Sequence, residues 1–87
     1  MEIKDYRDKI DNIDKNIGAL LNERLNVCRE IGKLKKDRNI PVTDEEREKT
    51  VIGRVCESGD CRENREAIRN IYKAIFDETK KIQQKEN

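Results

Sequence analysis

Two cations in the first half of the chain, Arg24 and Lys35, have the spacing of a pair that could close on one small dianion. On a helix, at about 100° per residue, they lie within about 20° of each other and roughly 16 Å apart along the axis. Arg7 lies about 25 Å from Arg24 along the same axis, too far to share a small ligand within one chain. If two such helices pack antiparallel, Arg7 of one protomer can meet Arg24 and Lys35 of the other.

Polar residues that could complete such a site follow later in the sequence. Asp44, Arg47 and Glu48 stand at the start of a second predicted helix. Thr79 and Gln83 fall on the inner stripe of a third, where apolar side chains would be expected. Fixed cations, carboxylates and amides on helices suit the binding of a small polyanion, or the stabilisation of charge that develops during a reaction.

The residue types that are missing narrow the chemistry further. The chain has no histidine, no GxSxG motif and no glycine-rich phosphate loop, so nucleophilic hydrolysis and nucleotide handling have little support. Cys28, Cys56 and Cys61 include no CxxC pair, and without histidine a structural zinc site would lack ligands. We therefore expect reduced thiols and no metal.

Each candidate residue also has an ordinary structural explanation. Charged residues on a helix are usually solvated, acids are common at helix starts, and polar residues in a core can simply be hydrogen-bonded. An arginine in an apolar seam can pair with an acid across a dimer. The candidates are therefore informative only as a set: Arg7, Arg24, Lys35, Asp44, Arg47, Glu48, Thr79 and Gln83.

One long helix must position most of these cations. Apolar residues recur alternately three and four positions apart from Ile3 to Leu34, which predicts a continuous helix over residues 3–38 with a buried seam. Arg24 occupies one seam position, where a cation costs free energy unless an anion meets it. Such a helix spans roughly 52 Å, whereas a compact chain of this length has a radius of gyration of about 12 Å. The remaining residues cannot cover both ends, so we expect a homodimer.

Two further helices complete an all-α prediction for a single domain, residues 1–87. The first helix should end by Asn39, because Pro41 follows at once. The second is expected over residues 44–57, with Thr43 as its cap and Glu46 completing a capping box. After a break at residues 58–60, the third should begin at 62–64 and end near 84.

The balance of charge excludes other classes of partner. Lys and Arg total 20 against 19 Asp and Glu, whereas nucleic-acid or anionic-membrane binding needs a clustered positive excess. No window approaches the ~18 apolar residues of a membrane span, and the N-terminus lacks the apolar core of a signal peptide. We expect a cytoplasmic protein.

Taken in order, the candidate residues resemble the all-helical chorismate mutases. The resemblance covers nearly the whole chain, and its pieces are Arg7, Glu23-Arg24, Gly32-Lys33-Leu34-Lys35, Pro41-Val42, Asp44-Glu45-Glu46-Arg47-Glu48, Thr79 and Gln83. It implies three helices per protomer in an intertwined homodimer. It also implies conversion of chorismate to prephenate by a pericyclic rearrangement, without metal or organic cofactor.

The resemblance assigns the cations to the two substrate carboxylates and to the breaking bond. Arg24 and the partner's Arg7 would bind the carboxylates, with Arg47 near one of them. Lys35 and Gln83 would donate hydrogen bonds to the ether oxygen, which gains negative charge as its C–O bond breaks.

The remaining roles concern the ring and its surroundings. Glu48 would accept a hydrogen bond from the ring hydroxyl, helped by the backbone around Asp44. Arg47 would help hold Asp44 or Glu48, and Thr79 would contribute a hydroxyl near a carboxylate.

Two alternatives remain open. An isochorismate pyruvate lyase uses the same fold and similar cations, although the pair of Glu48 and Gln83 favours the mutase. A non-catalytic helical dimerisation or regulatory module would need none of these side chains for chemistry.

Overall fold

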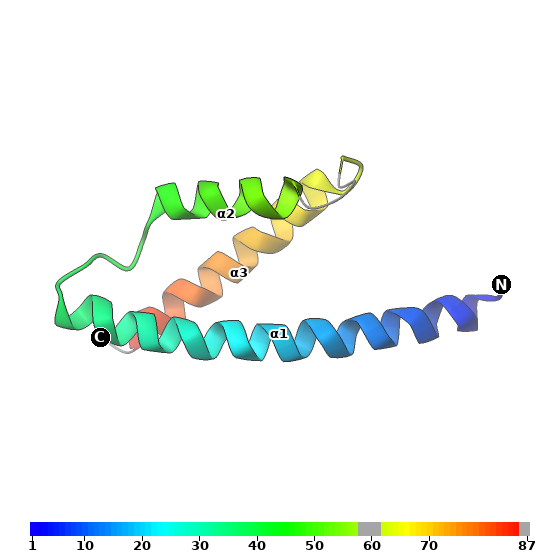
Figure 1. The fold of residues 1–87 in the computed structure, drawn as a ribbon, viewed down its shortest axis with the longest axis horizontal. Helices are drawn as coiled ribbons and strands as arrows, with labels where there is room; N and C mark the ends of the chain where they lie inside the picture. Colours follow the sequence, from blue (N-terminus) through cyan, green and yellow to red (C-terminus); the bar gives the residue numbers. More distant parts are fainter. Residues whose placement is uncertain (58–61, 86–87) are drawn as a thin grey trace.

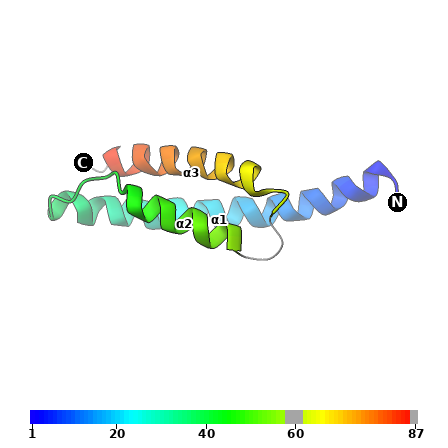
Figure 2. The same ribbon diagram turned by 90° about the horizontal axis from the view of Figure 1, so that it is seen from above.

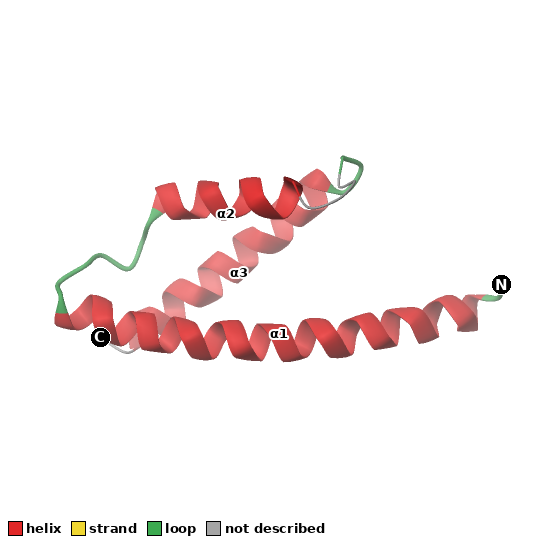
Figure 3. Ribbon diagram, viewed as in Figure 1, coloured by secondary structure: helices red, strands yellow, loops and turns green. Residues whose placement is uncertain are grey.

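The computed structural model of the chain describes residues 1–57 and 62–85. These residues form three helices, α1 (Ile3–Asp37), α2 (Glu45–Glu57) and α3 (Arg65–Lys85), with no strand among them (Figures 1 and 3). The prediction of an all-α fold with one long, one short and one medium helix is confirmed. The predicted break at residues 58–60, like Cys61, lies outside the described residues. Residues 62–64 form a turn before α3 rather than its first residues.

α1 ends in a Schellman motif that reverses the chain toward α2. Arg38 is the C-cap, and Asn39 adopts the left-handed conformation with a φ of 54°. The backbone N–H of Asn39 donates to the carbonyl oxygen of Lys36 at 3.3 Å, and that of Ile40 donates to Lys35 at 2.8 Å. These two bonds satisfy carbonyl groups that the helix end leaves free. The turn places the segment after Pro41 beside the last turn of α1.

The cap of α2 differs from the prediction. The carboxylate of Asp44 accepts a hydrogen bond from the backbone N–H of Arg47 at 3.0 Å, so Asp44 is the cap instead of Thr43. The helix starts one residue later than predicted. Aspartate caps a helix as well as threonine does, and its negative charge also favours the helix N-terminus. The sequence offered two adjacent caps, and local pattern alone chose the wrong one.

α3 connects the other two helices. In the described part of the chain, α1 and α2 each pack on α3 and not on each other. α1 and α3 run in the same general direction (Figures 1 and 2), and α2 lies apart from α1 in Figure 1. Few of the described side chains are buried: the apolar ones are Cys28 and Phe76, and the Phe76 ring packs on Tyr72 with 5.7 Å between centroids. The space between α1 and α2 is therefore not closed by direct packing.

The N-terminal half of α1 extends beyond the other helices (Figure 2). Its apolar seam is uncovered, and the exposed fractions of its members lie between 47% and 67%: Ile3, Tyr6, Ile10, Ile13, Ile17 and Leu20. The radius of gyration is 15.8 Å, well above the about 12 Å of a compact chain of this length. The seam that the periodicity predicts to be buried is thus not buried within one chain. None of the described helices is long and apolar enough to cross a membrane.

Substitution of Asn39 tests the reversal at the end of α1. Asn39→Ala should lower the free energy of unfolding by about 1 kcal/mol, because a left-handed backbone disfavours residues other than glycine, asparagine and aspartate. Asn39→Gly is the control and should retain stability, since glycine adopts this conformation freely. Urea unfolding at fixed protein concentration measures both variants. An equal loss in both would show that the amide side chain, and not the backbone angle, is what matters.

Candidate active site

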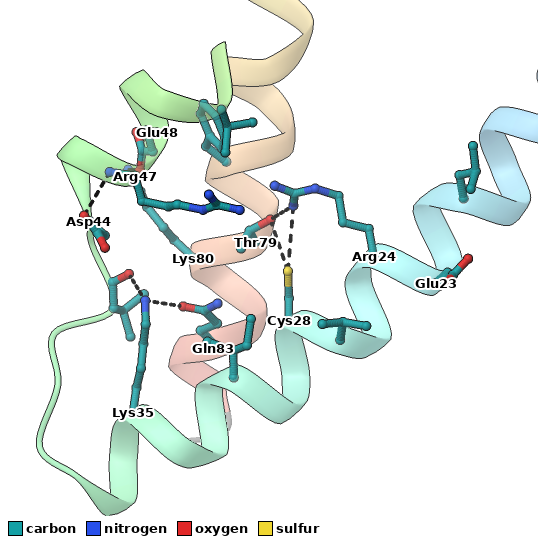
Figure 4. Close-up of a pocket in the computed structure, with 16 residues that line it drawn as sticks. Glu23, Arg24, Cys28, Lys35, Asp44, Arg47, Glu48, Thr79, Lys80 and Gln83 are labelled. Atoms are coloured by element: carbon teal, nitrogen blue, oxygen red, sulfur yellow. Dashed lines mark hydrogen bonds and ion pairs between the residues drawn. The ribbon is translucent and has the colours of Figure 1, made fainter. Parts of the chain in front are cut away.

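A cavity of ≈ 690 Å³ lies between α1 and α2, with α3 along one side (Figure 4). It is lined by residues from all three helices and from the segment before α2. Seven of the eight predicted site residues line it: Arg24, Lys35, Asp44, Arg47, Glu48, Thr79 and Gln83. Residues up to 59 positions apart in the sequence thus meet around one space.

Arg24 is half-buried on α1 and is held by neutral groups. Its Nη1 donates to the Thr79 hydroxyl at 2.8 Å and lies 3.7 Å from the Cys28 sulfur. Among the described residues, no carboxylate forms an ion pair with Arg24. A guanidinium carries five N–H donors in a rigid fork, so most of them remain free for an anion. The seam arginine is therefore oriented by the protein without being neutralised by it.

Lys35 and Gln83 form a second polar group at the other end of the cavity. Lys35 Nζ donates to the carbonyl oxygen of Val42 at 2.9 Å and to Gln83 Oε1 at 3.3 Å. Gln83 is buried, with 4% of its surface exposed. Because Oε1 accepts from the ammonium group, the Nε2 amide of Gln83 is left to donate. An ammonium has three donors, so Lys35 also retains one.

Gly32 makes this arrangement possible. A Cβ atom at position 32 would lie 2.9 Å from Gln83 Cα and 3.3 Å from its Cβ and Cγ. The backbone of α3 can therefore approach α1 only because position 32 carries no side chain. The sequence predicted no packing role for Gly32, which entered only as part of the segment Gly32-Lys33-Leu34-Lys35. The only signal was a glycine within a long helix, which Gly18 shares although nothing lies within 4 Å of it.

The start of α2 supplies the third group. Asp44 uses one carboxylate oxygen for the helix cap, and the Arg47 side chain points from α2 into the cavity (Figure 4). Glu48 Oε2 lies 3.1 Å from the Nζ atom of Lys80 on α3, and both side chains are about three-quarters buried, with 26% and 28% exposed. Lys80 was not predicted. It follows Thr79 directly, and lysine is the residue type expected on the surface of a helix, so no local pattern distinguished it.

Among the described residues, most of the charged side chains in the cavity that lack an oppositely charged partner are cations. Its acids are Glu23, Asp44 and Glu48, of which Asp44 caps α2 and Glu48 pairs with Lys80. Within residues 1–57 and 62–85, no acid pairs with the other cavity cations, Arg24, Lys35 and Arg47. Cations that lack an acidic partner suit a small ligand that carries two carboxylates.

Arg7 is the one predicted site residue that the structure does not bring to the cavity. It is exposed on the N-terminal half of α1, where the helix extends past α3. This agrees with the helical distance that separates it from Arg24 within one chain. Its predicted role requires a second protomer and remains a prediction.

Substitution of Gly32 tests the packing that positions Gln83. Gly32→Ala should lower the free energy of unfolding by about 1–3 kcal/mol, because the new methyl group overlaps the α3 backbone. Gly53→Ala on α2 is the control and should raise stability by about 0.5–1 kcal/mol, since alanine favours a helix and nothing lies within 4 Å of a Cβ atom at that position. Thermal and urea unfolding compare the two. A Gly32→Ala protein that unfolds at the same temperature and urea concentration as the wild type would contradict the close approach.

Comparisons with known proteins agree with this geometry. Residues 6–84 match the sequence profile of the family described as chorismate mutase type II. A bifunctional chorismate mutase/prephenate dehydratase from Aquifex aeolicus is 39% identical over 54 residues, or 62% of this chain and 15% of that protein. A chorismate mutase from Methanocaldococcus jannaschii is 35% identical over 54 residues, or 62% and 54% of the two chains.

A third relative has a different name, and a solved structure supports the fold. A 3-dehydroquinate dehydratase from Pyrobaculum aerophilum is 38% identical over 69 residues, or 79% of this chain. The chain spans only 22% of that protein and 15% of the bifunctional one. A conserved hypothetical protein from Pyrococcus furiosus has a TM-score of 0.77 and 36% identity, with 93% of both chains covered. The match over residues 6–84 shows that this chain belongs to the chorismate mutase type II family.

Proposed function

We propose that the protein is a chorismate mutase that converts chorismate to prephenate in phenylalanine and tyrosine biosynthesis. The observation that carries the proposal is a cavity of ≈ 690 Å³ in which Arg24, Lys35 and Arg47 have no acidic partner among the described residues. The family match and the two relatives with chorismate mutase in their names support the choice of substrate.

The cations bind and fold the substrate. Arg24, steadied by the Thr79 hydroxyl at 2.8 Å, presents its free N–H groups to one carboxylate. Arg47 reaches into the cavity from α2 (Figure 4) and would bind the same or the other carboxylate. Bidentate guanidinium pairing holds the enolpyruvyl arm over the ring, which removes much of the entropic barrier to the reactive geometry. One C–O bond then breaks as one C–C bond forms, and no protein group becomes covalently attached.

Lys35 and Gln83 stabilise the transition state. The ether oxygen gains negative charge as its C–O bond breaks, and it needs donors that are already in position. Lys35 is fixed by the Val42 carbonyl oxygen at 2.9 Å and by Gln83 at 3.3 Å. The Gln83 side chain is buried, with its Cβ and Cγ atoms against Gly32, and its Oε1 atom accepts from Lys35, so the Nε2 amide has a set position. Each well-placed donor that meets this charge is worth roughly 3 kcal/mol of barrier.

Glu48 recognises the ring hydroxyl. Its Oε2 atom is engaged by Lys80 at 3.1 Å, which leaves Oε1 as the acceptor for a hydroxyl proton. Asp44, whose carboxylate caps α2, fixes the backbone that carries both Arg47 and Glu48.

A homodimer completes the site. The uncovered seam of α1 is a long apolar stripe with exposed fractions near one half, which favours burial against a second copy. If two α1 helices pack antiparallel about a two-fold axis near Gly18, the partner's Arg7 lies level with the midpoint between Arg24 and Lys35. At that level the partner's Arg7 would add a guanidinium between the Arg24 end and the Lys35 end of the cavity.

Three other functions are weaker. An isochorismate pyruvate lyase would use the same cations, but the Glu48 acceptor and the Gln83 donor suit the mutase better. The activity named for the Pyrobaculum relative is not proposed, because the match covers 22% of that protein and this chain has no histidine for acid–base chemistry. A regulatory module would have no need of uncompensated cations.

Turnover of chorismate tests the proposal directly. The wild-type protein should remove the ultraviolet absorbance of chorismate as prephenate forms. Lys35→Ala should lower kcat by about a hundredfold or more, because a transition-state donor is lost. Lys36→Ala is the control, since Lys36 is exposed on the next position and does not line the cavity. Release of pyruvate from isochorismate, without loss of chorismate, would instead identify the lyase.

Mixing of two inactive variants tests the shared site. Arg7→Ala and Lys35→Ala homodimers should each have little activity. After unfolding and refolding together they form heterodimers in which one site carries both changes and the other carries neither. Activity should rise toward a quarter of the wild-type value, because about half the dimers are mixed and each has one intact site. Heterodimers that form without any gain would show that Arg7 does not act across the dimer.

A further inference from the structure

The ion pair between Lys80 and Glu48 stands apart from the others in the described part of the chain. The remaining pairs join residues three or four apart on one helix, and their side chains are more than half exposed. Lys80 and Glu48 join α3 to α2, and both line the cavity. Among these residues α2 packs on α3 and not on α1. The Lys80–Glu48 ion pair is therefore one of the contacts that set the position of α2 at the cavity.

We propose that Lys80 is a positioning and charge-balancing residue for Glu48, which tunes the site for a dianion. This inference rests on the proposed function. The ammonium group holds Oε2 so that Oε1 faces the ring hydroxyl, and the Lys80 side chain runs from α3 to Glu48 in Figure 4. It also cancels the charge of a carboxylate that stands in the same cavity as the ligand.

The electrostatic argument concerns what happens without Lys80. Glu48 is about three-quarters buried, so its charge is only partly screened by water. A dianionic ligand that enters the cavity would meet an uncompensated anion of the same sign. Substrate, transition state and product all carry two carboxylates, so the repulsion weakens the binding of each to a similar degree. Loss of Lys80 should therefore raise KM more than it lowers kcat.

The neighbouring residue supplies a matched control. Lys81 also pairs with a glutamate, Glu78, at the same distance of 3.1 Å. That pair lies on the outside of α3, with 65% and 61% of the side chains exposed, and neither residue lines the cavity. Lys81→Met thus removes the same charge and a lysine–glutamate pair of the same length without touching the site.

The experiment compares Lys80→Met, Lys80→Arg, Lys81→Met, Glu48→Gln and the Glu48→Gln/Lys80→Met double variant. Steady-state kinetics with chorismate and calorimetric binding of prephenate are measured at low and high salt. Lys80→Met should raise KM and the Kd of prephenate about tenfold at low salt, with a smaller effect at high salt. Lys80→Arg should restore most of the affinity, and Lys81→Met should behave as wild type.

The double variant decides how Lys80 acts. With Glu48 replaced by the neutral glutamine, Lys80→Met should have little further effect on the Kd, because no charge remains to be balanced. An equal penalty with and without Glu48 would overturn the proposal and would mean that Lys80 contacts the ligand itself. A Lys80→Met protein that matches Lys81→Met would also overturn it. A wild-type protein that neither consumes chorismate nor binds prephenate would overturn the proposed function instead.

Discussion

The close packing of α3 on α1 at Gly32 is the contact on which the site depends. Gly32 and Cys28 are four residues apart on α1, and they face Gln83 and Thr79, which are four apart on α3. Two small residues one turn apart open a groove on α1 that admits the polar side chains of α3. A larger residue at position 32 would hold α3 away from α1. It would then separate Lys35 from Gln83, and Arg24 from Thr79. A packing requirement thus sets the positions of the groups that carry the chemistry.

The position of α2, on the other side of the cavity, depends on this contact indirectly. α2 does not pack on α1 within the described residues, so its position follows from α3 and from the chain reversal at Asn39. The reversal brings Val42 to Lys35, and the tie between Lys80 and Glu48 joins α2 to α3. The cavity remains open between α1 and α2 because neither helix fills it. An open space bordered by fixed donors is what a small ligand requires.

The single chain leaves two features unsatisfied, and the proposed function accounts for both. Its cavity holds the half-buried cations Arg24 and Lys35, which no acid among the described residues neutralises, and this costs folding free energy. Its long helix exposes an apolar seam, which forgoes the largest source of stability for a chain with so small a core. A dicarboxylate ligand would meet the first deficit, and a second copy the second. Arg24 belongs to both features, since it occupies a seam position and lines the cavity.

The sequence by itself determined the three helices and most of the polar residues around the cavity. Periodicity and capping are local, so the long helix, the break near Pro41 and the polar positions Thr79 and Gln83 were readable from the order of residues. The cap of α2 was wrong by one residue because two good caps stand side by side. Tertiary structure alone decided that Gly32, and not Gly18, admits another helix, and that Lys80, and not Lys81, faces the cavity. Those choices depend on which face of α3 meets α1, and side-chain contacts between distant segments leave no local pattern in the chain.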